Sequence, residues 1–146
     1  MMNGLLHAHS GLRWIILIGL IITVITSIQG LTGQKEFTDK NRKLSLIGFI
    51  GSHIQLLIGL SLMFMSSKVN VERMMKTDVL RFFTLEHPFA MVIAIVLITL
   101  GYMKAKRGSD SRSKFKSLAV YYGIALLIIL ISIPWPFREA LGGSWG

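Results

Sequence analysis

Four long hydrophobic runs occupy most of the 146-residue chain, and they constrain its fold more than any other feature of the sequence. The runs cover residues 12–28, 44–65, 89–103 and 118–133. A helix needs roughly 17–25 mostly apolar residues to cross a bilayer. The second run lies well within this range, and the first is at its lower limit and lies within it when Leu5 and Leu6 are included. The third and fourth reach it when a few flanking residues are included. Backbone groups in lipid must be hydrogen-bonded within the chain, so each run is predicted to form a helix.

The connections between these runs are short, which favours antiparallel neighbours. The predicted fold is therefore an all-α, four-helix transmembrane bundle with up-down-up-down topology, formed by residues 1–146 as a single domain. A hydrophobic content of 52% agrees with this prediction, because soluble domains carry about 45–50%. The first run lacks the flanks of a cleavable signal peptide. The absence of cysteine excludes disulfides, iron–sulfur clusters, covalently attached haem and thiol catalysis.

The net charge of +9 is concentrated in the loops and predicts an orientation. Four Lys/Arg residues lie in 30–43 and six in 104–117, on the same predicted side of the membrane. The opposite side has the remaining six of the 16. The positive-inside rule then places both basic loops in the cytoplasm and both termini outside. These loops are expected to contact anionic lipids rather than nucleic acid, since no aromatic residues alternate with the basic ones.

All four histidines lie in or at the ends of the hydrophobic runs. Ionisable groups at membrane depth are costly, so each is a candidate functional residue. His7, His9 and His87 are expected at the outer face, where their convergence favours a haem or metal site. His53 lies nine residues into its helix, roughly 13 Å deep at 1.5 Å per residue. It either serves the site or bonds to a neighbouring helix.

His7 and His9 point in different directions on a helix, because two residues correspond to roughly 200° of rotation. His9 shares a face with Arg13 and Ile16, so it is the preferred inward residue. His7 is either an additional ligand or an exposed side chain near the terminus. Arg13 lies one turn below His9, where it can bind an anionic group such as a haem propionate or anchor the helix at the interface.

His87 lies between Glu86 and Pro88. Proline disfavours helical geometry in the preceding residue and is accepted at the first helical position, so His87 is expected to cap the third helix. His87 also lies three residues before Ala90 on a small-residue stripe that continues through Ala94 and predicts a helix-packing face. A second stripe on the helix of His53 consists of Gly48, Ser52, Gln55 and Gly59.

Four segments taken together suggest a family: 6–14, 52–59, 86–88 and 133–138. They resemble small four-helix "cytochrome b-like" integral membrane proteins of Bacteroidetes-type bacteria, over nearly the whole chain. The resemblance implies a b-type haem held by His9, His53 or His87, with His7 possible, and electron transfer with quinol. The chain departs from a two-haem pattern because its fourth helix has no histidine, so one haem is expected.

The leading hypothesis is a haem b protein of the bacterial inner membrane that acts in electron transfer, with quinol or a respiratory complex as the candidate partner. Of the candidate ligands, His9 and His87 match best in depth. Two alternatives stay open. The chain can be a cofactor-free accessory subunit of a larger membrane complex. It can also hold a metal ion at the outer face through His7, His9, Glu86 and His87, since such sets suit zinc or iron.

Overall fold

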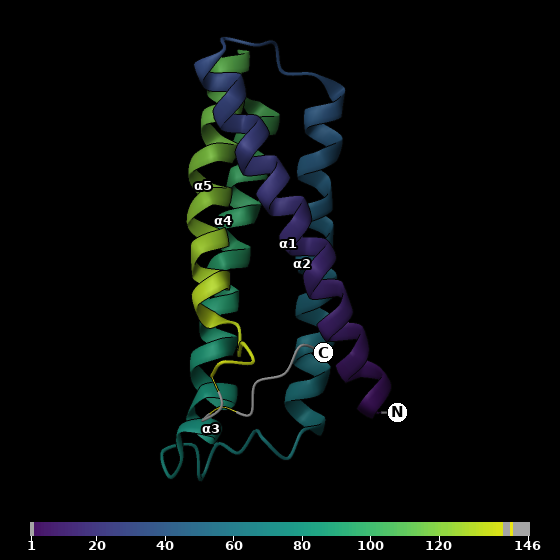
Figure 1. Ribbon diagram of the computed structural model, residues 1–146, viewed down its shortest axis with the longest axis vertical. Coiled ribbons are helices and arrows are strands. Elements are labelled where there is room, and N and C mark those ends of the chain that lie inside the picture. Colours follow the sequence, from purple (N-terminus) through teal and green to yellow (C-terminus); the bar gives the residue numbers. More distant parts are fainter. Residues whose placement is uncertain (1, 139–140, 142–146) are drawn as a thin grey trace.

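The computed structural model describes residues 2–138 and 141, and every long element in this part of the chain is a helix. The elements, in chain order, are α1 (Met2–Thr32), α2 (Asp39–Met65), α3 (Asp78–Arg81), the π-helical segment η1 (Phe82–Glu86), α4 (His87–Arg107) and α5 (Ser111–Ser132) (Figure 1). Because α3, η1 and α4 follow one another without a break, they form a single long helix over residues 78–107.

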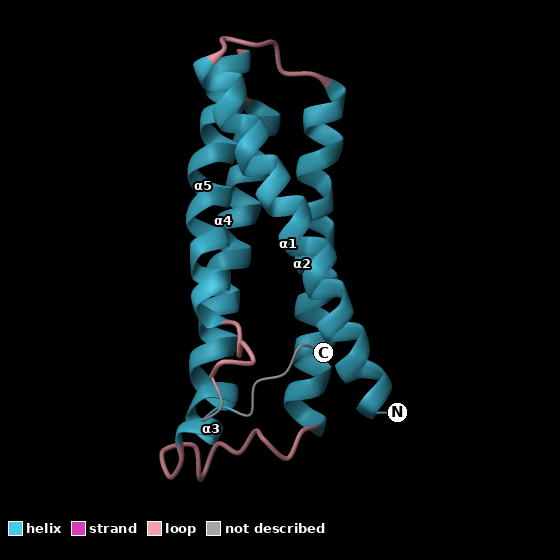
Figure 2. Ribbon diagram, in the orientation of Figure 1, coloured by secondary structure: helices cyan, strands magenta, loops and turns pink. Residues whose placement is uncertain are grey.

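Four helices in the described residues are long and apolar enough to cross a membrane. Their most apolar stretches have mean hydropathies between 1.8 and 2.2. Loops join successive helices at alternating ends of the molecule (Figure 2). The structure therefore confirms the predicted all-α, four-helix transmembrane bundle with up-down-up-down topology.

The two ends of the bundle differ in character. The loops 33–38 and 108–110 lie together at the end that carries the ten clustered Lys/Arg residues, which we call the basic end (Figure 1). The start of α1, the loop 66–77 and the exit from α5 lie at the opposite end, which we call the histidine end. His7, His9 and His87 all belong to the histidine end, as the antiparallel arrangement predicted.

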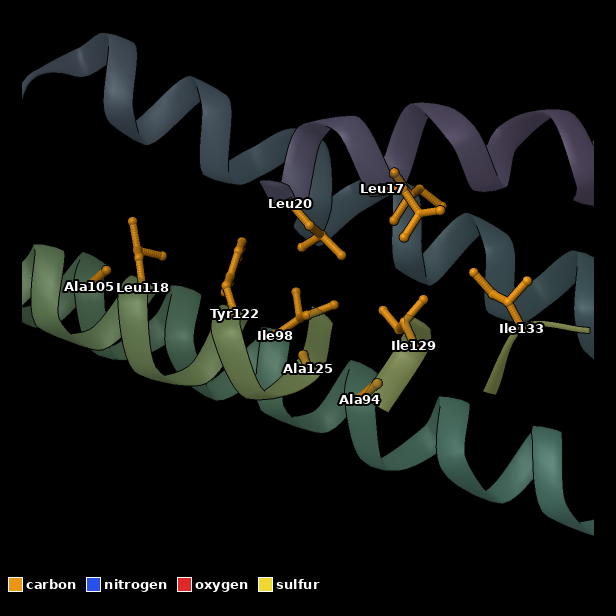
Figure 3. Close-up of a cluster of buried hydrophobic side chains, with 11 residues drawn as sticks. Leu17, Leu20, Ala94, Ile98, Ala105, Leu118, Tyr122, Ala125, Ile129 and Ile133 are labelled. Carbon is orange, nitrogen blue, oxygen red and sulfur yellow. The ribbon is translucent and has the colours of Figure 1, made fainter. Parts of the chain in front are cut away.

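The core lies between α1, α4 and α5 (Figure 3). Leu20, Ile98 and Tyr122 are fully buried there, one from each of these helices. The Tyr122 hydroxyl donates a 2.8 Å hydrogen bond to the backbone carbonyl of Ser45 on α2. A buried hydroxyl needs such a partner, so Tyr122 links α5 to α2 in a region where α2 offers few large side chains.

The predicted small-residue stripe of α2 is the face that receives α1. Gly48 and Ser52 are buried, and a Cβ atom at Gly48 would lie 2.8 Å from the side chain of Leu20. Farther along, a Cβ atom at Gly59 would lie 3.3 Å from Cε1 of His9. Small residues thus let α1 approach α2 closely and leave room for the His9 ring.

The expectation that His87 caps a helix is wrong. The helix begins nine residues earlier at Asp78, where the Thr77 side chain accepts a 3.2 Å hydrogen bond from the backbone of Leu80. His87 has helical backbone angles, and its N–H bonds to the carbonyl of Phe82, five residues back. Pro88 removes one N–H and would crowd the preceding turn of a regular helix. The wider π-helical turn before Pro88 accommodates it, and such turns are frequent at functional sites.

Candidate functional site

The imidazole rings of His9 and His87 meet edge to face at the histidine end. Their centroids lie 6.5 Å apart, with the ring planes at 69°. His9 comes from the first part of α1 and His87 from the junction of η1 and α4. The two residues predicted to match best in depth therefore do meet, across helices that are far apart in the sequence.

His87 is held in a defined orientation. Its Nδ1 lies 2.8 Å from the backbone carbonyl of Ser132, the last residue of α5. A carbonyl can only accept, so Nδ1 carries the proton and Nε2 carries the lone pair. The Ser132 carbonyl has no partner within its own helix end, and the imidazole satisfies it. On the other side, the ring of Phe82 packs 5.8 Å from His87.

His9 is half-buried and is positioned through its backbone. The Nε2 amide of Gln55 on α2 donates a 2.7 Å hydrogen bond to the His9 carbonyl, which fixes α1 against α2 at this level. The sequence placed Gln55 on a packing stripe but gave no sign of this bond. Among the described residues, Nδ1 of His9 is a buried nitrogen with no hydrogen-bond partner. Leaving such a group unsatisfied costs roughly 1–3 kcal/mol, so the site tolerates a cost that an apolar core would avoid.

Arg13 extends the site along α1. Its guanidinium lies 5.1 Å from the ring of Trp14, and Arg13 follows His9 by about one helical turn. Trp14 contacts Trp135, whose ring centroid is 6.0 Å away. The Trp135 indole in turn donates a 2.8 Å bond to the carbonyl of Leu130. The exit from α5 therefore folds across the histidine end and meets α1 beside Arg13.

Two of the predicted site residues stay outside this arrangement. His7 is exposed. Glu86 is also exposed, and its carboxylate accepts a 2.7 Å hydrogen bond from Arg81 instead of approaching the histidines. The described part of the chain contains no group of three or more His, Asp or Glu side chains arranged to hold a metal ion. The metal site built from His7, His9, Glu86 and His87 is therefore not assembled here.

His53 lies apart from the pair, half-buried where α2 faces α4. Its Nδ1 donates to the Phe49 carbonyl at 2.7 Å, and its Nε2 lies 3.4 Å from the hydroxyl of Thr99 on α4. That hydroxyl has one proton and also lies 2.8 Å from the Ile95 carbonyl, so its contact with His53 is the weaker one. The contact across the helix interface is therefore present but long, and the His53 ring is only half-buried.

Imidazole nitrogens are common metal ligands, and the described residues bring two imidazoles together at this end. They come from different helices, and α1 packs mainly on α2 and α5 rather than on α4. The chain matches no protein-family model, no curated protein and no solved structure.

Proposed function

We propose that this protein binds one b-type haem between His9 and His87 and takes part in electron transfer within a bacterial inner membrane. The observation that carries the proposal is the edge-to-face pair of imidazoles from α1 and α4. The ring centroids lie 6.5 Å apart and the rings come from helices distant in the sequence, so His9 and His87 are the two residues that would hold the haem iron.

The hydrogen bonding of the two rings also supports the proposal. Metal-binding histidines usually donate their other ring N–H to a carbonyl or carboxylate, as His87 does to Ser132. His9 presents a buried nitrogen without a partner, which ligation or a ligand-induced shift would satisfy. Haem would supply one-electron redox chemistry, while the chain supplies the ligands and sets their orientation.

Arg13 is the residue proposed to pair with a haem propionate. It lies one turn after His9 on α1, and arginine binds carboxylates in a bidentate manner. Arginine at this position would favour a haem whose charged edge points toward the histidine end. Quinol and other subunits of a respiratory complex are the proposed redox partners, and both follow from the family resemblance alone.

The test is the absorbance spectrum of protein purified from its native host with haem available. A Soret band that shifts on reduction, with a bis-histidine low-spin signature, is expected. His9→Ala and His87→Ala should each abolish it, whereas His7→Ala, which removes an exposed histidine two residues away, should leave it intact. A colourless native preparation would overturn the proposal and favour the cofactor-free accessory subunit. A haem spectrum unchanged in both His9→Ala and His87→Ala would overturn the assignment of these two ligands.

We also propose that the basic end faces the cytoplasm and that both termini are outside. The support is the excess of Lys/Arg in the loops at that end, ten against six elsewhere in the chain. Because the chain has no cysteine, single cysteines at Ser109 and Ser67 report on opposite ends without background. An impermeant thiol reagent added to intact cells should label Ser67→Cys only. Labelling of Ser109→Cys alone would reverse the orientation.

A further inference from the structure

The loop between α1 and α2 is anchored to α5 and shapes a cavity at the basic end. The Phe37 N–H donates a 2.9 Å hydrogen bond to the hydroxyl of Ser111, and the Phe37 ring packs edge-to-face on Phe115 at 5.0 Å. Phe115 is only 2% exposed. These contacts fix the position of the loop, so the cavity that it borders is a built feature of the fold.

This cavity has a volume of about 150 Å³ and lies between α2, α4, the start of α5 and the anchored loop. One water occupies about 30 Å³ of liquid, so the space is large enough for a phosphate group with part of its ester substituents. The residues that the argument uses are Phe37, Asp39, Arg42, Tyr102, Lys106 and Lys114.

The charge of the cavity is positive. Arg42 pairs with Asp39 at 3.3 Å, which neutralises the one carboxylate that lines it. Lys106 and Lys114 have no carboxylate within ion-pairing distance among the described residues. The ammonium of Lys114 lies 5.7 Å from the Phe37 ring, which holds it at the rim. Two cations without a carboxylate partner therefore face a cavity of phosphate size.

The cavity is bordered by an aromatic ring on the part of α4 that precedes Lys106 by one turn. Tyr102 lines it and stacks on Phe49 of α2 at 4.6 Å, and both rings are half-buried. Tyrosine at the end of a membrane-spanning helix lies at the depth of lipid headgroups. The cavity thus has cations on its aqueous side and aromatic rings where a lipid backbone would continue, a combination that suits a phospholipid better than free phosphate.

We infer that this cavity binds the phosphate of an anionic phospholipid, with Lys106 and Lys114 as its charged contacts. Basic pockets between membrane-spanning helices are known to recognise such headgroups. The inference goes beyond the proposed haem function and is independent of it, because the cavity lies at the opposite end of the bundle from His9 and His87.

The experiment titrates delipidated protein in detergent with phosphatidylglycerol or phosphatidylcholine and counts bound lipid by native mass spectrometry. Phosphatidylglycerol should bind to the unmodified chain more tightly than phosphatidylcholine. The double variant Lys106→Gln/Lys114→Gln should bind phosphatidylglycerol about 25-fold more weakly, because each lysine is expected to contribute roughly fivefold to the affinity. The matched control Lys40→Gln/Lys116→Gln removes the same charge from exposed positions outside the cavity and should retain most of the affinity.

Two results would overturn the inference. One is non-specific attraction, which would appear as an equal loss of phosphatidylglycerol affinity in both double variants or as equal affinity of the unmodified chain for both lipids. The other is tight binding of inorganic phosphate that depends on Lys106 and Lys114 while lipid binding does not, which would identify free phosphate as the occupant. Haem content should be the same in both double variants, so this test and the spectroscopic one can fail separately.

Discussion

Replacing Gly30 by alanine tests how tightly α1 meets α5 near the basic end. A Cβ atom at Gly30 would lie 2.5 to 2.6 Å from three atoms of the Phe115 ring. Phe115 is 2% exposed and is flanked by Phe37, so its ring has little room to withdraw. Overpacking of this kind typically costs about 1–3 kcal/mol.

The control must remove the general effect of alanine on helices, which is favourable by about 1 kcal/mol relative to glycine. Gly123→Ala serves this purpose, because a Cβ atom at Gly123 in α5 meets nothing within 4 Å. Gly30→Ala is therefore expected to be about 1–3 kcal/mol less stable than Gly123→Ala, since helix propensity cancels in the comparison.

The assay is unfolding by SDS in mixed micelles, followed by tryptophan fluorescence. Trp14 on α1 and Trp135 after α5 lie 6.0 Å apart, so their emission reports on separation of these helices. A second variant makes the test specific: Phe115→Leu should reduce the cost of Gly30→Ala through a coupling energy of at least about 0.5 kcal/mol. Equal stabilities of Gly30→Ala and Gly123→Ala, with no coupling to Phe115, would refute the described contact.

Three further predictions use the same unfolding assay. Tyr122→Phe should lower the free energy of unfolding by about 1 kcal/mol because it removes the bond to the Ser45 carbonyl. The control Tyr121→Phe alters a half-buried ring and should lower it less. Equal losses of stability would contradict the role of that bond. His53→Leu should also cost about 1 kcal/mol through its bond to Phe49, and exposed His7→Leu should cost nothing measurable; equal tolerance would argue against a special role for His53. A hydrogen bond from the Ser113 backbone holds the pKa of the Asp110 carboxyl below its ordinary value. The ionised carboxylate therefore stabilises the start of α5 fully at a pH above the ordinary pKa, and this stabilisation is lost as the pH falls through the lowered pKa. In Asp110→Asn the free energy of unfolding should change less between mildly and strongly acidic pH than in the unmodified chain. The same pH dependence in both proteins would count against a role for Asp110 as the helix cap.

Much of the fold followed from hydrophobicity, because lipid leaves the backbone few choices. The four spans and their antiparallel order were predicted, as was the meeting of His9 with His87. The start of the third helix was not. The sequence signal for this start is the capping residue Thr77, which lies before a stretch of mixed polarity. The prediction instead rested on Pro88, because proline disfavours helical geometry in the residue before it. The π-helical turn that reconciles the two has no recognisable sequence pattern.

The polar contacts of the site were harder to foresee than its location. Glu86 is adjacent to His87, yet its carboxylate bonds to Arg81, because successive helical residues point about 100° apart. Gln55 acts through the backbone carbonyl of His9, and backbone acceptors leave no mark in a sequence. The anchoring of the loop by Phe37 depends on Ser111, a partner 74 residues away.

The distribution of polar groups along the bundle distinguishes the histidine end from the basic end. Toward the basic end, buried polar groups such as the Tyr122 hydroxyl have a partner that stabilises the bundle. At the histidine end, Nδ1 of His9 is buried and has no hydrogen-bond partner among the described residues. The neighbouring imidazole is that of His87, which uses Nδ1 in its bond to Ser132 and has its lone pair on Nε2. Leucine at position 9 would avoid the cost of roughly 1–3 kcal/mol that this nitrogen imposes on the folded state. Departures from locally optimal packing are expected where a chain holds a ligand, so the cost itself is an argument for a bound group between α1 and α4.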